Sequence, residues 1–434
     1  MAYSFHNVES DWITQLPIGW EIRPLKWFAS SGSGISFTKA DLVEEGNAVI
    51  SYGQVHAKNN PQTFVIDDLI RYIPDELIQD KEKALCNMGD FIFADTSEDL
   101  AGCGNCVFID RDSIIYAGYH TIRLQNKSLK NGRFFAYQFM SDNWRKQIRS
   151  RVKAVKTYSV AQTILNQTSV IIPPADVQKA IVDYLDKECG RIGQEIELLE
   201  RKADAYRRLR RSIINQAVTR GLNPNVKMVP SGNKWIGDIP EHWKMERVQY
   251  HFHSNTEANK DYEFQSAFKF YMGTIVQKNE EFDAEDYQET YEKYTKVKKD
   301  DIIINGLNLN YDLKSMRVAI VPYDGILTSA YLVLRPFEGE NANFFNYLFK
   351  AFDNRKFFHG MGSGVRLTLA FKELKAFEIP IPPMSEQSEI VDFLDDKCSK
   401  IETIVSKITE KIEKLKALKR SLINEVVTGQ RAII

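Results

Sequence analysis

Two long segments of this chain repeat each other without a gap. One runs from Pro173 to Thr219 and the other from Pro382 to Thr428, at a constant offset of 209 residues, and 18 of the 47 aligned positions are identical. Chance does not produce an ungapped match of this length. The chain therefore contains two copies of one unit, and both copies must adopt the same fold.

Each copy has the periodicity of one long helix. Apolar residues recur at alternating spacings of three and four, which is typical of a coiled-coil seam. A Pro-Pro pair that cannot lie inside a helix opens each copy, so Asp176 and Ser385 are the predicted N-caps. Gly221 and Gly429 stand where a helix stop is expected. The predicted seam consists of Ile192, Ile196, Leu199, Ala203, Tyr206, Ile213 and Ala217 in the first copy and of Ile401, Val405, Ile408, Ile412, Leu415, Leu422 and Val426 in the second.

A helix of about 43 residues is about 65 Å long, which is too long to be buried inside a globular domain. Its outer faces are rich in Lys, Arg and Glu, so the apolar seam needs a partner helix, and the nearest one is its own repeat. The sequence predicts an antiparallel intramolecular coiled coil. The alternative is two independent helices, each packed on its own domain, but neither shows the broad apolar stripe of a core-facing helix.

The blocks that precede the helices also repeat. Both open with the same frame, formed by Trp12, Pro17 and Trp20 and, 223 residues later, by Trp235, Pro240 and Trp243. Inside the blocks, residues 89–97, 107–124 and 134–140 parallel residues 300–308, 318–335 and 344–350. The first two segments of each set are β-rich and the third is an aromatic helix, whereas the loops between them diverge completely.

This pattern predicts an α+β protein with a pseudo-two-fold internal repeat, in which two similar mixed α/β domains are joined by the two long helices. The expected boundaries are 1–172 for the first domain, 173–220 for the first helix, 221–234 for a linker, 235–381 for the second domain, 382–429 for the second helix and 430–434 for a tail.

The composition limits the possible partners and the compartment. Lys plus Arg (57) and Asp plus Glu (58) nearly cancel, so nucleic-acid binding would depend on local clusters of charge. Five cysteines fit a reducing cytoplasm better than a disulfide scaffold. The N-terminus has no signal-peptide pattern, and no apolar run approaches the roughly 18 residues of a membrane span. We expect a cytoplasmic protein without a membrane partner.

Catalytic motifs give weak matches. The glycine-rich DLAGCGN from Asp99 precedes a predicted strand, whereas a cofactor loop needs a helix at that point. IPPA at Ile172 and IPPM at Ile381 lack the polar and aromatic residues of an amino-methyltransferase motif. Cys103 and Cys106 form a single CxxC without a second pair at zinc-ligand spacing. We expect no catalytic residue, no metal site and no cofactor in this chain.

Positive charge clusters in residues 145–156, where six of twelve residues are basic and none is acidic. Such a cluster favours contact with phosphate groups, and the alternative is a solvated helix face. The predicted DNA-binding residues of the first block are Arg145, Lys146, Arg149, Arg151, Lys153, Lys156 and Tyr158. The loops at 30–39 and 95–99 are candidate surfaces beside them.

In the second block, glycines lie next to basic residues and could let the backbone approach a phosphate. Loop amides could bind base edges, although for any single residue a structural role in the loop is favoured over a base contact. The predicted residues are Asn305, Asn308, Arg355, Lys356, Gly362, Ser363 and Arg366.

Taken in order along the chain, these features resemble the specificity subunit of type I restriction-modification systems. The resemblance is carried by the frame W-I-x-x-x-P-x-x-W that opens each block and by the IPPxxxQ that leads into each long helix. It covers essentially the whole chain. It implies two target recognition domains, spaced by the coiled coil, that read an asymmetric bipartite target in double-stranded DNA.

The resemblance also implies the partners of the chain. Two methyltransferase (modification) subunits would dock on the helices, bring S-adenosylmethionine and methylate adenine N6, and restriction subunits would add cleavage that depends on ATP and Mg. The chain itself would catalyse nothing. Two alternatives stay open at this point: a self-contained DNA adenine methyltransferase, and a coiled-coil adaptor without DNA binding.

Overall fold

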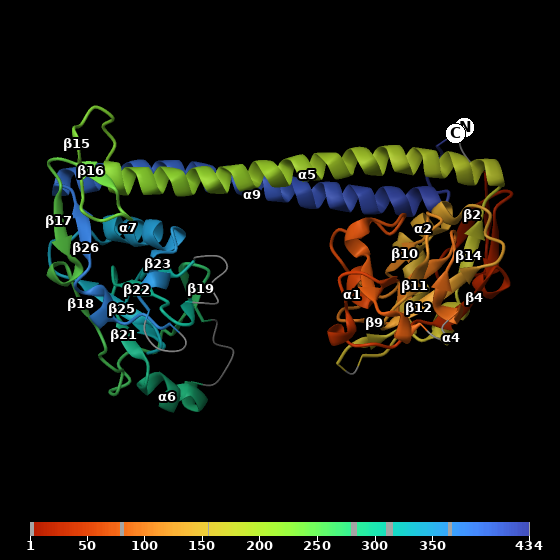
Figure 1. The fold of residues 1–434 in the computed structure, drawn as a ribbon, viewed down its shortest axis with the longest axis horizontal. Coiled ribbons are helices and arrows are strands. Elements are labelled where there is room, and N and C mark those ends of the chain that lie inside the picture. The colour runs from red at the N-terminus through yellow and green to blue at the C-terminus, as the bar shows by residue number, and fades with distance from the viewer. Residues whose placement is uncertain are drawn as a thin grey trace. The chain divides into compact units, whose positions relative to one another are not determined.

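The computed structural model describes residues 4–78, 82–154, 156–278, 284–309, 316–362 and 367–433. The chain divides into two compact units: unit 1 comprises residues 1–199 and 410–434, and unit 2 comprises residues 200–409. Each unit therefore contains one globular domain together with one end of each long helix (Figure 1).

The two long helices are α5 (Ala175–Arg220) and α9 (Met384–Val427). Both end at the predicted glycines, because Gly221 and Gly429 each have a φ of +72°, a conformation that a side chain disfavours. In the part of the chain that the structure describes, no helix is long and apolar enough to cross a membrane.

The start of each long helix differs from the prediction. Both helices begin one residue before the expected cap, so Asp176 and Ser385 lie inside the first turn and the predicted N-caps were wrong. The chain entry is held instead by glutamine side chains, since Gln178 Nε2 donates to the carbonyl of Pro173 at 2.8 Å. Gln387 makes the equivalent hydrogen bond in the second copy at 3.0 Å.

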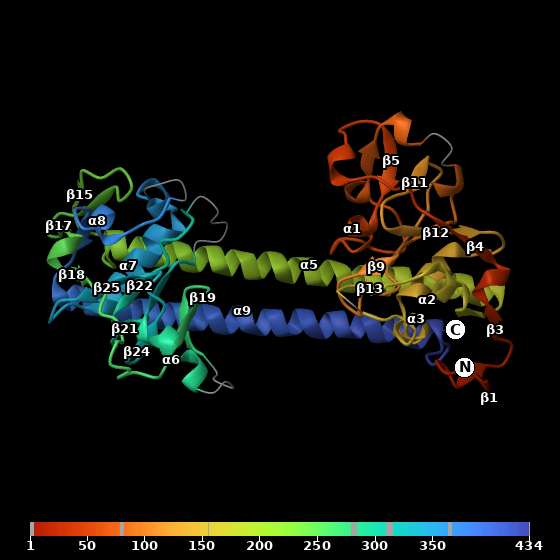
Figure 2. The same ribbon diagram turned by 90° about the horizontal axis from the view of Figure 1, so that it is seen from below.

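Within unit 1, segments of α5 and α9 run antiparallel. Glu195 forms an ion pair with Lys411 at 2.8 Å, whereas the earlier Cys189 of α5 lies within the electrostatic reach of the later Lys419 of α9. The residue number in α9 therefore falls as the number in α5 rises. The predicted antiparallel pairing is confirmed here, and the two helices are side by side in Figures 1 and 2.

Unit 2 repeats this arrangement with the other ends of the helices. Arg210 pairs with Glu402 at 2.8 Å, and Gly221 at the end of α5 lies against the side chain of Glu386 at the start of α9. Arg210 and its repeat equivalent Lys419 occupy the one seam position that lacks an apolar residue. The predicted seam residues of both helices are buried or half-buried.

The two domains are built on the same sheet. In the first domain a four-stranded antiparallel sheet has the order β10-β8-β12-β4, and in the second the equivalent strands have the order β23-β22-β25-β18. Their bounds are β4 Ala29–Ser33, β8 Phe91–Ala94, β10 Cys106–Phe108, β12 Thr121–Asn126, β18 Phe252–Ser254, β22 Ile302–Ile304, β23 Val318–Ile320 and β25 Leu332–Pro336.

Smaller strand groups surround these sheets. The first domain has a mixed sheet of order β6-β5-β11-β7, in which β11 is parallel to β5, and the pairs β1-β2, β3-β14 and β9-β13. These strands are β1 Phe5–Asn7, β2 Gln15–Pro17, β3 Glu21–Pro24, β5 Asn47–Ile50, β6 Arg71–Ile73, β7 Leu85–Cys86, β9 Thr96–Ser97, β11 Ile115–Ala117, β13 Tyr158–Ser159 and β14 Ser169–Ile172.

The second domain has the pairs β15-β16, β17-β26, β19-β20 and β21-β24. Strand β15 lies within the segment that was predicted to be a linker. The bounds are β15 Met228–Pro230, β16 Asp238–Pro240, β17 Lys244–Arg247, β19 Phe268–Tyr271, β20 Thr274–Gln277, β21 Thr295–Val297, β24 Gly325–Leu327 and β26 Glu378–Ile381. The shorter helices of both domains are α1 Tyr52–Val55, α2 Gly132–Met140, α3 Asp142–Arg149, α4 Gln162–Asn166, α6 Ala284–Glu292, α7 Ala342–Asn354 and α8 Phe371–Leu374.

The aromatic helices α2 and α7 join each sheet to the long helices. Phe134 and Phe139 of α2 are fully buried in one core with residues of both α5 and α9. A polar contact repeats in the two units: the Tyr137 hydroxyl donates to Asp186 of α5 at 2.7 Å, and the Tyr347 hydroxyl donates to Asp395 of α9 at 2.6 Å. Each domain is thereby fixed to the long helix that follows it in the chain.

The far end of each long helix meets the entry of a domain. Gly221 lies against Trp243 in unit 2, and Gly429 lies against Trp20 and Pro17 in unit 1. The last residues of the chain therefore return to the domain with which the chain begins. Unit 1 is completed only by residues 410–434.

Helix α7 has a lysine where its counterpart α2 has Met140. Burial first, and then the nearby Arg210, lower the pKa of Lys350 from its usual 10.5 to about 8. We predict that Lys350→Met raises the free energy of unfolding by roughly 1–2 kcal/mol near pH 7, because it removes a poorly solvated charge.

A lowered lysine pKa weakens the folded state below about pH 8 and stops doing so as the pH approaches 10.5. The gain should therefore shrink over that range, measured by chemical denaturation of wild type and variant. Lys372→Met, at a lysine whose side chain is 75% exposed, is the control and should leave stability unchanged. An equal gain at all pH values would contradict this explanation.

Candidate nucleic-acid interface

The predicted basic cluster begins on α3, and its first member is buried. Arg145 is only 7% exposed. Its Nε donates to the carbonyl of Phe139 at 2.8 Å, and its Nη2 donates to Gln62 Oε1 at 2.6 Å. The prediction that Arg145 contacts DNA was wrong, because α3 packs the face with Trp144 and Ile148 on the core and takes the guanidinium inward.

Three more basic residues of the cluster are engaged within the domain. Lys146 and Arg151 donate to backbone carbonyls. Arg149 binds Asp142 Oδ1 at 2.9 Å through Nη1 and donates to the carbonyl of Ala101 at 2.8 Å through Nη2. These contacts hold α3 in place and reduce the charge that this part of the cluster offers to a phosphate.

Asp142 connects α3 to the end of α9. Its carboxylate accepts hydrogen bonds from Arg420 and from Asn424 Nδ2, and its backbone N–H donates to Asn424 Oδ1 at 2.7 Å. Partial burial would raise the pKa of Asp142, but the hydrogen bonds from Arg420, Asn424 and Arg149 outweigh it and lower the pKa to about 2. The hydrogen bonds of Asp142 to Arg420 and Asn424 thus fix the orientation of α3.

The remaining basic residues lie where the chain leaves α3. Lys153 and Lys156 are exposed, and no hydrogen bond or ion pair to either is present among the described residues. Tyr158 begins strand β13, which pairs with β9 so that Tyr158 lies opposite Ser97. This pairing leads the basic segment to the rim of a cleft.

The cleft has a volume of about 770 Å³ and is lined by residues of α1 and β9, two elements that are labelled in Figure 1. Its lining is mainly polar and includes an exposed lysine, Lys58, and the loop predicted as a candidate surface at 95–99. The lining residues are Tyr52, Gly53, His56, Lys58, Thr96, Ser97, Glu98, Asp99, Ala101, Gly102, Asn105, Tyr119, His120 and Thr157.

Aromatic rings form one wall of this cleft. The Tyr52 ring packs edge-on against Tyr119 and against His120, in both cases with ring centroids 5.7 Å apart. The ring centroids of Tyr119 and His120 are 4.2 Å apart. His120 has a φ of +52°, a backbone conformation that is rare for residues with a side chain and that is often found at functional sites.

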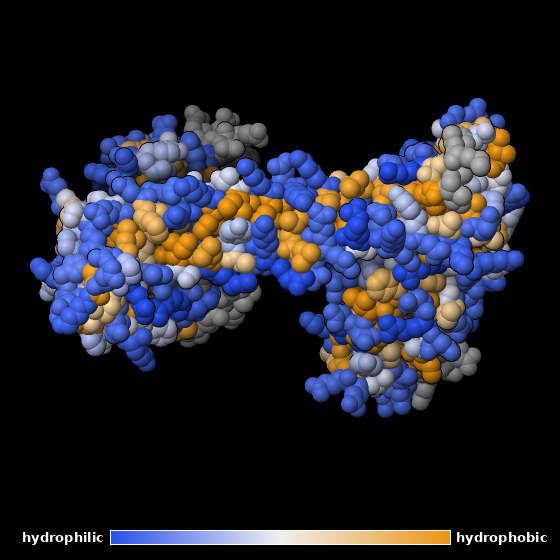
Figure 3. Space-filling view, turned by 90° about the horizontal axis from the view of Figure 1, so that it is seen from above, coloured by the Kyte–Doolittle hydropathy of each residue, from blue (hydrophilic) through white to orange (hydrophobic). Residues whose placement is uncertain are grey.

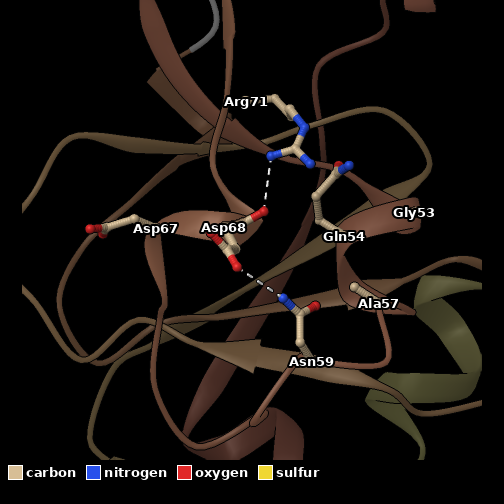
Figure 4. A pocket seen from close by; sticks show the side chains of 7 residues that line it. All are labelled: Gly53, Gln54, Ala57, Asn59, Asp67, Asp68 and Arg71. Atoms are coloured by element: carbon tan, nitrogen blue, oxygen red, sulfur yellow. Dashed lines mark hydrogen bonds between the residues drawn. The ribbon is translucent and has the colours of Figure 1, made fainter. Parts of the chain in front are cut away.

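Two further hollows adjoin the cleft. One, of about 420 Å³, shares Tyr119 and His120 with it and reaches the predicted loop at 33–36. The other, of about 450 Å³, shares Gly53 (Figure 4). There Arg71 Nη1 donates to the carbonyl of Asp68 at 2.9 Å, while the Asp68 carboxylate accepts from Asn59 at 3.3 Å. Both hydrogen bonds are drawn in Figure 4.

The predicted loop of the second domain follows β22, as the 95–99 loop follows β8. Arg317 holds this loop, because Nη1 donates to the carbonyls of Asn305 and Leu307 and Nη2 donates to that of Asn308. Asn305 is half-buried, whereas Asn308 is exposed with a φ of +51°. Asn308 occupies the repeat position of Ser97, which lines the cleft of the first domain.

The other predicted residues of the second domain lie near this loop or beyond α7. Gly362 packs against Leu309 so closely that a side chain would clash. Arg355 is exposed, and Lys356 is half-buried with a φ of +60°. Ser363 and Arg366 lie outside the described residues.

No group of three or more His, Cys, Asp or Glu side chains within the described ranges is arranged to bind a metal ion. Cys103 and Cys106 are buried in the apolar core of the first domain, and burial raises the pKa of the Cys106 thiol to about 12. The glycine-rich turn at 99–105 leads into strand β10 and not into a helix.

Comparison with known proteins decides the family. The model of the type I restriction modification DNA specificity domain matches residues 17–200 and 236–414, which is most of the chain. The chain belongs to this family. It is thus a specificity subunit that recognises DNA sequence and does not catalyse a reaction, as the resemblance implied, and the methyltransferase and adaptor alternatives have no support.

Relatives match this specificity subunit along its length. The type I restriction enzyme MjaX specificity subunit of Methanocaldococcus jannaschii is 22% identical over 449 residues, covering 99% of this chain and 97% of that protein. A chain solved in a study of complex assembly and conformational transition of the type I R-M system has the same fold, with a TM-score of 0.66, 15% identity and coverage of 96% and 99%. The HsdS subunit from Thermoanaerobacter tengcongensis matches with a TM-score of 0.47 and 16% identity, over 96% and 98%.

Several residues of the cleft were not found from the sequence of the specificity subunit. Tyr52 comes from one segment and the adjacent Tyr119 and His120 from another, and only the fold gathers them. A weak signal existed in the dipeptide Tyr119-His120, because two ring-bearing residues directly before a strand are well placed to form a wall. No pattern in the sequence indicated that these aromatic residues lie close to the loop at 95–99.

We predict that Asp142→Asn weakens the specificity subunit at neutral pH by roughly 1–2 kcal/mol, since the ionised carboxylate binds two arginines. The pKa of Asp142 is lower in the folded than in the unfolded chain, so its contribution is complete above about pH 4 and is lost as the pH falls towards 2. Urea denaturation between pH 7 and pH 2.5 should show the two proteins converging at low pH. Asp112→Asn, at an exposed aspartate, should match wild type throughout, and a constant difference between wild type and Asp142→Asn would contradict the assigned role.

Proposed function

We propose that this specificity subunit reads an asymmetric bipartite target in double-stranded DNA, one half with each domain, and carries two methyltransferase subunits on its helices. The observation that carries the proposal is the combination of equal sheets with unequal loops. Equivalent strands have the same order in both domains, whereas the loops that follow β8 and β22 differ: the first lines a cleft, and the second is held by Arg317. Two readers with different surfaces select two different half-sites.

In the first domain, DNA would enter the cleft beside α1 and β9. Lys58 borders it, and Lys153 and Lys156 precede the lining residue Thr157 in the chain. These lysines would contact phosphates and give affinity, while the polar side chains inside the cleft would meet base edges and give specificity. Tyr158 would position the basic segment through its pairing with Ser97.

In the second domain, the exposed amide of Asn308 is the best-placed base contact, since asparagine can bind an adenine edge with both of its polar atoms. Asn305 would act by shaping the loop. Arg355, Lys356 and Gly362 would lie along the DNA backbone, and contacts by Ser363 and Arg366 stay predictions from the sequence.

The test of DNA reading uses the complete complex and its target, identified by mapping methylated adenines in host DNA. Lys153→Glu with Lys156→Glu should weaken target binding at least about tenfold at moderate salt and lower the slope of log K against log salt by about two. Lys130→Glu, an exposed lysine outside the cleft and the basic segment, is the matched control. Unchanged binding by the double variant would show that the lysines only face solvent.

The docking of partners would use a leucine that the repeat presents twice. Leu209 of α5 and Leu418 of α9 are equivalent positions, and they are 47% and 48% exposed. Each is followed by two basic residues. Apolar side chains gather over the helices in Figure 3. Two equal anchors, one in each unit, fit two copies of one partner, which is why we assign them to two methyltransferase subunits.

Charge at either leucine should release one partner. In reconstituted complexes, the specificity subunit with Leu209→Glu or Leu418→Glu should retain one bound methyltransferase subunit, and the double variant should retain none. The reason is that a buried anchor at an interface is worth about 2 kcal/mol or more. Native mass spectrometry gives the subunit count. Leu198→Glu is the control, as Leu198 is 59% exposed but has a lysine, Lys407, at its repeat position. Retention of both partners by the double variant would contradict this docking site.

The reactive chemistry would come from the partners. The methyltransferase subunits would supply S-adenosylmethionine for adenine N6 methylation, and restriction subunits would supply ATP- and Mg-dependent cleavage. Such an assembly acts on chromosomal and incoming DNA, so its place is the cytoplasm.

A further inference from the structure

His120 stands at the junction of two hollows in the first domain. It lines both the 770 Å³ cleft and the neighbouring 420 Å³ hollow. Its side chain is 45% exposed, and its ring is held by Tyr52 and Tyr119. Its left-handed φ of +52° is kept in place by the hydrogen bond from the Asp95 N–H to the His120 carbonyl at 3.2 Å. The ring is therefore both accessible and fixed in direction.

The side chain of Asp95 determines which nitrogen of His120 carries the proton. His120 Nδ1 lies 3.1 Å from Asp95 Oδ1, and an ionised carboxylate can only accept hydrogen bonds. Nδ1 must therefore donate, and in the neutral ring Nε2 is then an acceptor. Thr96 Oγ1 donates to the same carboxylate oxygen at 2.8 Å, which fixes Asp95 in turn. The described residues provide no hydrogen-bond partner for His120 Nε2.

The other histidine of the cleft, His56, has no ring nitrogen without a hydrogen-bond partner. His56 Nε2 lies 2.8 Å from the carbonyl of Thr96, which accepts only, so this nitrogen carries the proton. His56 Nδ1 then accepts from Asn105 Nδ2 at 3.1 Å. Both ring nitrogens of His56 are therefore bonded within the domain, and of the two histidines it is His120 that offers an acceptor to a ligand.

The surroundings of His120 also present acceptors. The carboxylates of Glu98 and Asp99 line the same cleft and belong to exposed residues. These carboxylates repel phosphate groups, so phosphates would stay at the lysines of the rim. In the major groove, adenine and cytosine present an amino group, N6 or N4, whereas guanine and thymine present oxygen acceptors at the corresponding edge. A surface of acceptors selects the amino group.

We infer that His120 is a specificity-determining residue of the first domain and that its Nε2 accepts a hydrogen bond from the amino group of an adenine or cytosine in the first half-site. The inference rests on the proposed reading of DNA by this cleft and adds the chemical class of the base that is read. Asp95 acts as a positioning residue, because it sets the tautomer of the ring.

The first test compares the sequences selected from a random DNA library by the complete complex with methyltransferase subunits. His120→Gly removes the ring and suits the left-handed backbone, so the domain should still fold. Wild type should require adenine or cytosine at one position of the first half-site, and His120→Gly should accept the other bases there, with discrimination reduced roughly tenfold. The second half-site should not change. His253→Ala, at an exposed histidine of the second domain, should leave the first half-site as in wild type.

A second measurement separates base reading from a structural effect. At the affected position, the base is replaced by its analogue without the amino group, purine for adenine or pyrimidin-2-one for cytosine. Wild type should lose roughly tenfold in affinity, whereas His120→Gly should bind both DNAs equally. A domain that was merely disturbed by the substitution would still distinguish the two DNAs.

The outcomes distinguish this inference from the function on which it rests. Relaxed discrimination at a guanine or thymine would overturn the tautomer argument. If wild type selects a target and His120→Gly selects the identical one, His120 does not read a base, and the proposed function stands. If the wild-type complex selects no sequence, the proposed function itself fails.

Discussion

Apolar side chains from both ends of α5 and α9 complete the core of each domain, and the position of the candidate interface follows from this packing. In unit 1, Leu185 of α5 and Leu422 of α9 share one buried cluster with Phe134 of α2. Because α2 is held against the helices, α3 is held as well, and Asp142 adds a polar connection to the end of α9. The segment that follows α3, with Lys153 and Lys156, is thereby held at the rim of the cleft. The long helices are thus part of the domains and more than a connection between them.

The repeat preserves contacts and varies surfaces. Asp90 and its repeat equivalent Asp301 are both almost fully buried and each pairs with an arginine, Arg123 and Arg335, although the two arginines stand at different positions of the repeat. A buried ion pair adds little net stability, but the loss of one partner would be costly, so such pairs restrict how the sheet can be rebuilt. The loops that follow β8 and β22 differ between the two domains. This division lets one scaffold support two different recognition surfaces.

The long helices, their glycine stops and the shared architecture of the domains could be predicted because they depend on period and on internal repetition, both of which are visible in one sequence. The N-caps were misplaced by two residues, since the glutamines at 178 and 387 bind the proline carbonyls and the helices start earlier than predicted. Arg145 was misjudged because a count of charges does not say which way a side chain points. The spacing of Trp144 and Ile148 was the available sign that one face of α3 turns inward. The wall formed by Tyr52, Tyr119 and His120 depends on contacts between distant segments, which no local pattern reports.

The return of the chain end to the first domain has a consequence for synthesis on the ribosome. Leu422, Ile423, Val426 and Val427 belong to the same apolar cluster as Trp20 and Phe134, so the first domain lacks part of its interior until these residues, roughly 400 positions after Trp20, have been translated. A nascent or prematurely terminated chain would carry this unfilled apolar surface for the whole interval, and long-range closure of this kind is slow and prone to aggregation. Chaperone demand during translation should therefore be concentrated on the N-terminal half of the protein.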